Sequence, residues 1–283
     1  MNKRDAYPDL VAGGTAGGPA RASAGLGRGV LHQAAAAGRF QLVRHQPSAA
    51  LAPFVEYYWI VRWDLRGRLP HEQTILPHPN VHLVFEEPVA SIYGVEKTLF
   101  VQRIEGRSQV LGVRFRAGGF RPFWTGPVSQ LNDRTVAAAE LFGPAAEKAR
   151  RVIVSAPDDA GMVAEAEDLL GSVRPRRDPV AEQVAAVVDR IVGDPSLRRV
   201  DELAAVLHVP VRRLQRLFAD YVGVSPKWVM RRARLHEAAE RADSGIRVDW
   251  AELAHDLGYA DQAHLTRDFT ATIGVPPARY AGI

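Results

Sequence analysis

The fold is decided by a stretch that occurs twice: LAAVLHVPVRRLQRLFADYVGVSP at residues 203–226 and LAHDLGYADQAHLTRDFTATIGVPP at residues 253–277. The segment Leu214–Phe218 in the first copy returns 51 positions later as Leu265–Phe269. At the start of the first copy, Glu202–Ala204 returns after 50 positions as Glu252–Ala254, so the second copy is one residue longer between its two halves. A repeat at a nearly fixed interval indicates one supersecondary unit that is built twice.

Apolar spacing identifies the unit as two short helices. In the first copy Leu203, Ala204 and Leu207 form one stripe, and His208-Val209-Pro210 then interrupts the helix before Val211–Tyr221 restarts it. Two helices joined by about four residues form a helix-turn-helix, whose second helix enters the DNA major groove. In the second copy Asp261 is predicted to cap the restarting helix with its carboxylate.

Polar residues should cover the outer faces of both second helices. If Leu214 and Phe218 point inward, then Arg212, Gln215 and Arg216 lie together outside. Arginine can bond to guanine O6 and N7 together, and glutamine can do the same with adenine N6 and N7. The corresponding outer residues of the second copy are Ala263, Thr266 and Arg267, with Gln262 and His264 beside them. We therefore expect the second surface to bind bases more weakly.

Charge is distributed unevenly around the repeat. The whole chain has a formal net charge of +4, but the segment from Arg198 to Arg234 has nine basic residues against three acidic ones. From Leu235 onward four arginines face eight carboxylates. A local basic excess suits a phosphate-binding surface, although a solvated helix face would look the same. We therefore predict that the first unit supplies most of the DNA affinity.

Length and composition divide the rest of the chain. The 283 residues suggest two domains, and the absence of cysteine excludes disulfides, thiolate zinc sites and a cysteine nucleophile. We expect a flexible arm over residues 1–38, a β-rich domain over 39–170, a linker over 171–178 and a helical domain over 179–283. Within the β-rich domain, Val128–Phe142 and Ala160–Leu170 have helical patterns. The sequence has no apolar run of about 18 residues that could span a membrane and no signal pattern at its N-terminus, so we expect a cytoplasmic protein.

The C-terminal segment resembles the DNA-binding domain of the AraC-type transcription regulators, a bacterial family. The resemblance rests on Gly258–Phe269, Gly274–Pro277 and Tyr280, and on a long helix at about Lys227–Ala242 between the two helix-turn-helix units. It covers roughly residues 179–283 and implies an α+β chain: a β-rich regulatory domain followed by an all-α domain with tandem helix-turn-helix units. Tyr57–Trp124 also resembles a subgroup of the front domains of this family, through Ile75–Pro77 and Gly112–Phe120.

The resemblance also implies partners and site residues. Double-stranded DNA is the expected partner, with RNA polymerase as a second partner if the protein is an activator. The front domain is expected to bind a small-molecule effector or another protomer in a homodimer. The family's base-reading positions fall on Arg212, Gln215, Arg216, Gln262, Thr266 and Arg267. For phosphate contact we name Arg198, Arg199, Lys227, Arg231 and Arg232. Pro210-Val211 stands where the family usually has a small polar cap, which leaves the start of the first recognition helix uncertain by a residue.

The front domain offers weaker signals. His71, His78 and His82 near several glutamates raise the alternative of a metal site in a barrel, but surface and turn histidines are the simpler interpretation. The aromatic residues of this stretch are Phe54, Tyr57, Tyr58, Trp59 and Trp63. Such residues more often pack in a core than line a pocket, although a cavity lined by aromatic residues is also typical of a small-molecule site. Nothing in the sequence calls for a cofactor or for catalysis. The competing hypotheses are an enzyme or metal-binding protein with a scaffolding helical domain, and a helical domain that binds protein.

Overall fold

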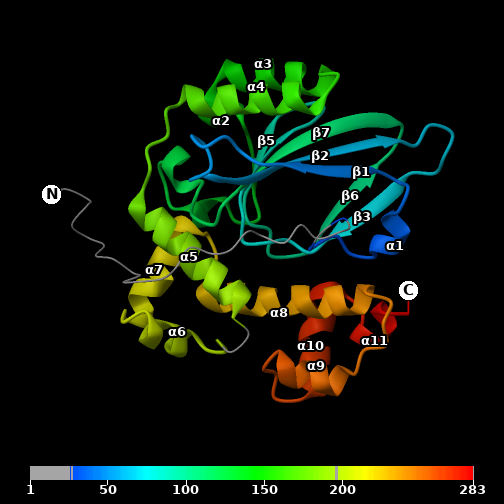
Figure 1. The fold of residues 1–283 in the computed structure, drawn as a ribbon, viewed down its shortest axis with the longest axis vertical. Helices are drawn as coiled ribbons and strands as arrows, with labels where there is room; N and C mark the ends of the chain where they lie inside the picture. Colours follow the sequence, from blue (N-terminus) through cyan, green and yellow to red (C-terminus); the bar gives the residue numbers. More distant parts are fainter. Residues whose placement is uncertain (1–25, 27, 195–196, 283) are drawn as a thin grey trace.

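A computed structural model describes residue 26, residues 28–194 and residues 197–282 of the chain. A β-rich part comes first and a purely helical part follows it, as the sequence predicts (Figure 1). Among the described residues, no helix is long and apolar enough to cross a membrane.

Two antiparallel sheets form the β-rich part. The larger sheet has the strand order β1-β2-β7-β4-β5-β8, and β3 pairs with β6 in a separate ribbon. The strands are β1 (Gln41–His45), β2 (Val55–Asp64), β3 (His71–Ile75), β4 (His82–Phe85), β5 (Ser91–Tyr93), β6 (Phe100–Ile104), β7 (Arg107–Phe115) and β8 (Thr135–Ala137). The ribbon faces the larger sheet across a cavity, so the two together resemble an open barrel (Figure 1).

The alternation of side chains along β2 separates the two faces of the larger sheet. Tyr58 and Ile60 are completely buried in the core on the outer face of the sheet. Tyr57, Trp59 and Trp63 point the other way and line the cavity. The expectation that these aromatics belong to the core is therefore right for Tyr58 and for Phe54 but wrong for the three cavity residues, because a strand sends alternate side chains to opposite faces.

Helices cover the outer face of the larger sheet. They are α2 (Ala139–Phe142), α3 (Pro144–Ser155) and α4 (Asp159–Ser172), and α3 and α4 lie side by side above β7 (Figure 1). The predicted helix at 160–170 is confirmed, but the helix expected over Val128–Phe142 is wrong. That segment is divided into a 3₁₀ turn (η3, Val128–Leu131), β8 and α2. Thr135–Ala137 pairs with β5 instead of continuing a helix, so tertiary pairing overrides the local pattern.

Of the segment before β1, the structure describes residue 26 and residues 28–40. Residues 1–25 and residue 27, most of the expected flexible arm, lie outside the described residues. The remainder contains α1 (Gln33–Ala36), and Leu31 and Ala36 are buried. Leu31 N–H donates to the Thr74 carbonyl at 3.1 Å. Residues 28–37 therefore pack against the ribbon, in contrast to the expectation of a flexible arm.

Seven helices form the rest of the described chain. They are α5 (Pro179–Gly193), α6 (Val200–Val206), α7 (Val211–Tyr221), α8 (Pro226–Asp243), α9 (Trp250–Asp256), α10 (Gln262–Ile273) and α11 (Pro277–Tyr280). α6 with α7 and α9 with α10 are the two copies of the repeat, and α8 joins them. Val229 and Met230 of α8 pack into the core of the first copy, whereas Leu235 and Ala238 pack into that of the second.

Candidate nucleic-acid interface and adjoining cavity

The first recognition helix, α7, presents the predicted polar face. Leu214, Leu217 and Phe218 are buried, whereas Arg212, Gln215 and Arg216 are exposed. The helix begins at Val211, and Pro210 before it makes no side-chain cap. Three base-reading candidates therefore lie together on one exposed face, as i, i+3, i+4 spacing requires.

The second recognition helix, α10, is built in the same way. Asp261 Oδ1 accepts a hydrogen bond from the His264 amide at 2.6 Å, so the predicted N-cap is confirmed. Gln262 and Arg267 are exposed, and Thr266 is half-buried. Leu265 and Phe269 on the opposite side are completely buried.

Of the five basic residues proposed for phosphate contact, four are exposed and one, Arg232, is buried. Arg198, Arg199, Lys227 and Arg231 are exposed. Of these, Arg199 forms an ion pair with Asp201 at 2.8 Å, and Arg231 reaches across from α8 to pair with Asp268 of α10.

Arg232 is a correction to that set. Only 4% of the surface of Arg232 is exposed. Its Nη2 donates to the Lys97 carbonyl of the β-rich part at 2.7 Å, and its guanidinium lies over the Trp228 ring. Burial, followed by the charge of neighbouring Arg231, lowers the pKa of Arg232 to about 10. In this arrangement Arg232 binds the β-rich part and does not face a phosphate.

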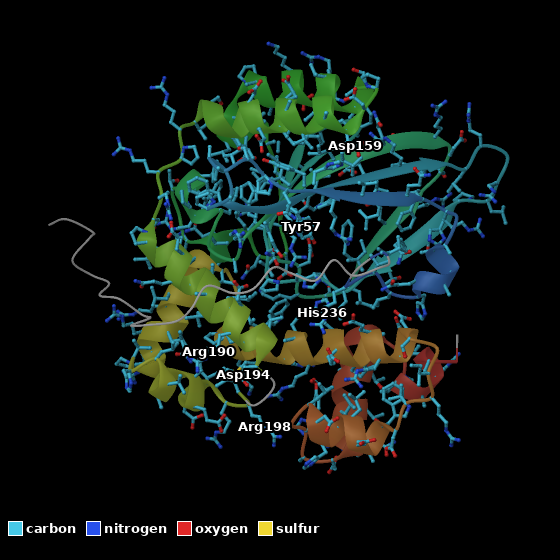
Figure 2. The ribbon with its side chains drawn as sticks, viewed as in Figure 1. Tyr57, Asp159, Arg190, Asp194, Arg198 and His236 are labelled. Atoms are coloured by element: carbon cyan, nitrogen blue, oxygen red, sulfur yellow. The ribbon has the colours of Figure 1, made fainter. Side chains whose placement is uncertain are left out.

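The β-rich part docks on α8 through histidine and arginine contacts that were not predicted. The rings of His78 and His236 stack with centroids 3.9 Å apart at an interplanar angle of 11°. His236 Nε2 donates to the Pro77 carbonyl at 3.3 Å, and His236 lies where the two parts meet (Figure 2). Arg28 pairs with Glu237 and with Glu240 of the same helix. His78 and His236 are separated by 158 positions, so no local pattern could have paired them.

The docking contacts extend to both helix-turn-helix units. Val95 and Ala117 belong to the apolar core of the first unit, and Leu31 and Leu76 belong to that of the second. Asn132 Nδ2 donates to the Gly223 carbonyl at 2.7 Å, just beyond the C-terminal end of α7. One face of the β-rich part therefore contacts both DNA-reading units.

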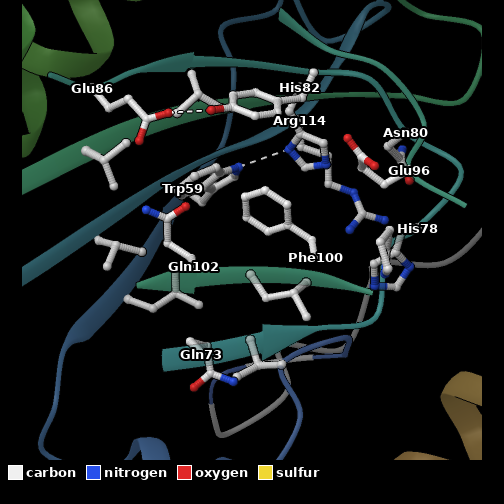
Figure 3. A pocket seen from close by; sticks show the side chains of 18 of the residues that line it. Trp59, Gln73, His78, Asn80, His82, Glu86, Glu96, Phe100, Gln102 and Arg114 are labelled. Atoms are coloured by element: carbon white, nitrogen blue, oxygen red, sulfur yellow. Dashed lines mark hydrogen bonds between the residues drawn. The ribbon is translucent and has the colours of Figure 1, made fainter. Parts of the chain in front are cut away.

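The cavity between the larger sheet and the ribbon opens beside this interface. Its volume is about 240 Å³. Aromatic and aliphatic side chains make most of its wall, and Arg28 contributes to its lining. His78 and Arg114 also line it (Figure 3). Among the described residues, no group of three or more histidine, aspartate or glutamate side chains is placed to hold a metal ion.

Comparisons with known proteins match both parts of the chain. Residues 43–137 match a family described as a domain of unknown function (DUF6597), and residues 203–282 match one described as a helix-turn-helix domain. A search of curated proteins finds no match.

Solved structures with a similar course include ToxT from Vibrio cholerae. An apo variant of ToxT from strain SCE256 is 12% identical, with a TM-score of 0.38, over 90% of this chain and 96% of that one. Wild-type ToxT bound to an unsaturated fatty acid is 11% identical, with a TM-score of 0.36, over 86% of this chain and 91% of that one.

Proposed function

We propose that this chain is a transcription regulator of the AraC type, whose helix-turn-helix domain reads two successive major grooves of its DNA site with α7 and α10. The observation that carries the proposal is the duplicated unit, in which each second helix buries its apolar face and exposes a polar one. Major grooves on one face of B-DNA recur at about 34 Å, one helical turn.

The exposed residues have distinct tasks in this proposal. Arg212 and Arg216 of α7, together with Arg267 of α10, bind guanine O6 and N7. Gln215 and Gln262 bind adenine, and Thr266 contacts a thymine methyl. Arg198, Arg199, Lys227 and Arg231 hold the phosphates and fix the register without reading sequence.

The β-rich part acts as the regulatory domain in this proposal, and its cavity holds a small-molecule effector. Support comes from position, because His78 lines the cavity and also stacks on His236 of α8. α8 joins the two reading units, so a ligand that moves the Pro77–Asn80 loop would change their relative placement. The division into domains at residues 39–170 and 179–283, a homodimer, and contact with RNA polymerase stay predictions. A DNA-binding regulator of this type acts in the bacterial cytoplasm.

The test is selection of bound sequences from a random DNA pool with the wild type, Arg216→Ala and Arg267→Ala. Arg151→Ala, an exposed change on α3 in the β-rich part, is the control. Arg216→Ala should cost about 1–3 kcal/mol and relax base preference at one position, with a smaller loss for Arg267→Ala. A larger loss for Arg267→Ala would refute the predicted asymmetry. DNA binding that is absent or insensitive to salt would refute the function itself.

A further inference from the structure

Strand register gathers polar side chains into one row of the cavity wall. Arg114 of β7 lies opposite Tyr57 of β2 on one side and opposite His82 of β4 on the other. His82 in turn lies opposite Tyr93 of β5. Directly opposed side chains are about 4.5–5.5 Å apart at Cβ, and all four of these residues line the cavity. The next row along the sheet, Trp59, Gly112 and Val84, carries no charge.

Three residues of this row, Tyr57, Arg114 and His82, can donate hydrogen bonds into the cavity, and we call them the donor row. Arg114 Nη1 donates to the Tyr57 hydroxyl oxygen at 3.1 Å, which leaves the hydroxyl hydrogen of Tyr57 available to another acceptor. The Trp59 indole N–H can only donate, and it donates to His82 Nδ1 at 3.2 Å. The His82 proton is therefore on Nε2. Burial, and then the charge of Arg114, lower the pKa of His82 to about 3, so the ring stays neutral.

The charge of Arg114 is anchored from outside the cavity lining. Glu56 accepts from Arg114 Nε at 2.8 Å and from Asn80 Nδ2 at 3.3 Å. The ion pair with Glu56 fixes the guanidinium of Arg114, while the Nη atoms of Arg114 face the cavity (Figure 3). A guanidinium held in this way favours a planar oxyanion, since its donors form a fork.

The neighbouring row supplies a flat apolar platform. A Cβ atom at Gly112 would lie 2.0 Å from Trp59 Cε2, so only glycine lets the indole lie across β7. The His82 hydrogen bond holds the indole there. Phe100 of the ribbon contributes a second ring to the same cavity (Figure 3). Rings of this kind can hold the aromatic ring of a ligand by offset stacking.

We propose that the cavity binds a small aromatic carboxylate, with its ring against Trp59 and its carboxylate at the row of Tyr57, Arg114 and His82. The inference rests on the proposed function, because it names the chemical class of the effector. Glu86 and Glu96 also line the cavity and would suit a cation instead. However, Glu86 already accepts from the Tyr93 hydroxyl at 2.6 Å, and the fixed charge of Arg114 repels a cation from the donor row.

Three probes with one ring system and different head groups test this assignment. Indole-3-acetate carries the carboxylate, indole-3-acetamide is neutral, and tryptamine is a cation. Isothermal titration calorimetry on the full-length protein should give the tightest binding for the acetate, about tenfold or more over the amide, as expected when a charge-assisted hydrogen bond is lost. Tryptamine should bind most weakly. Tighter binding of tryptamine, or no binding of any probe at millimolar concentration, would overturn the proposal.

Two neighbouring tyrosines provide a matched pair of variants. Tyr57→Phe removes a hydroxyl from the donor row and should weaken acetate binding about tenfold. Tyr58→Phe removes a hydroxyl from the opposite face of the same strand and should leave binding unchanged. Equal effects of the two changes would overturn the proposal.

DNA binding of the same samples, measured without a probe, separates the two claims. Intact salt-sensitive DNA binding with no preference for the acetate would reject only the ligand class. If the wild-type protein does not bind DNA, the proposed function as a DNA-binding regulator is rejected.

Discussion

Acidification should weaken the folded protein through the histidine stack between the β-rich part and α8. His236 is 4% exposed. Burial, and then the charge of Arg232, lower its pKa to about 3, with smaller contributions from Arg114 and Arg28. Burial and the neighbouring His236 ring also hold the pKa of His78 well below its ordinary value. Both rings are therefore neutral in the folded protein at neutral pH.

The sign and size of the effect follow from proton linkage. In the unfolded chain a histidine takes up a proton below about pH 6.5, whereas folded His236 does not until about pH 3. The free energy of unfolding is therefore at its full value above about pH 6.5 and falls as the pH decreases toward 3. At pH 5.5, one unit below the unfolded pKa, His236 should cost about 1.4 kcal/mol of stability. The lowered pKa of His78 should add a loss of the same sign.

Urea denaturation of the wild type and of His236→Gln at about pH 7.5 and pH 5.5 measures how much of the free energy of unfolding is lost on acidification. Glutamine keeps an N–H donor for the Pro77 carbonyl but cannot take up a proton. The His236→Gln variant should therefore lose about 1.4 kcal/mol less stability than the wild type between the two pH values. His255→Gln, at an exposed site on α9, should behave like the wild type. If His236→Gln loses as much stability on acidification as the wild type, a neutral buried histidine at this position is refuted.

Two further predictions address the cavity wall and the DNA surface. Gly112→Ala should destabilise the protein by about 1–3 kcal/mol in urea denaturation, because its methyl group would displace the Trp59 ring; an unchanged midpoint would contradict this packing. Lys227→Met should reduce the slope of log affinity for DNA against log salt by about 1, whereas Arg232→Met, on the same helix but buried, should leave the slope unchanged. A slope for Arg232→Met that is reduced as much as that for Lys227→Met would show that Arg232 also reaches the DNA backbone.

The helical part could be predicted well because its information is local and repeated. The 51-residue interval and the buried stripe of Leu214 and Phe218 were enough to place α7 and its exposed face. The cap at Asp261 followed from one residue type at one position. The β-rich character of the part ahead of the helical one was also predicted correctly.

What could not be predicted depends on pairing between distant segments. The spacing of α8 alone does not distinguish Arg231, which is exposed, from Arg232, which is buried under the β-rich part. Which arginine is covered depends on where Lys97 arrives, 135 positions earlier in the chain. The donor row has the same origin, because the register of β2, β7 and β4 brings Tyr57, Arg114 and His82 together.

α8 determines how a ligand in the cavity can act on DNA reading. Its first half packs in the core of one reading unit and its second half in the core of the other. Arg232 lies between these halves, and His236 lies at the start of the second half. None of the base-reading side chains of α7 and α10 is among the residues that line the cavity, so we expect a ligand there to leave their donors and acceptors unchanged. A shift at His236 would instead alter the spacing and angle between the two helices. An effector should therefore change the preferred distance between the two half-sites, while the preferred bases within each half-site stay the same.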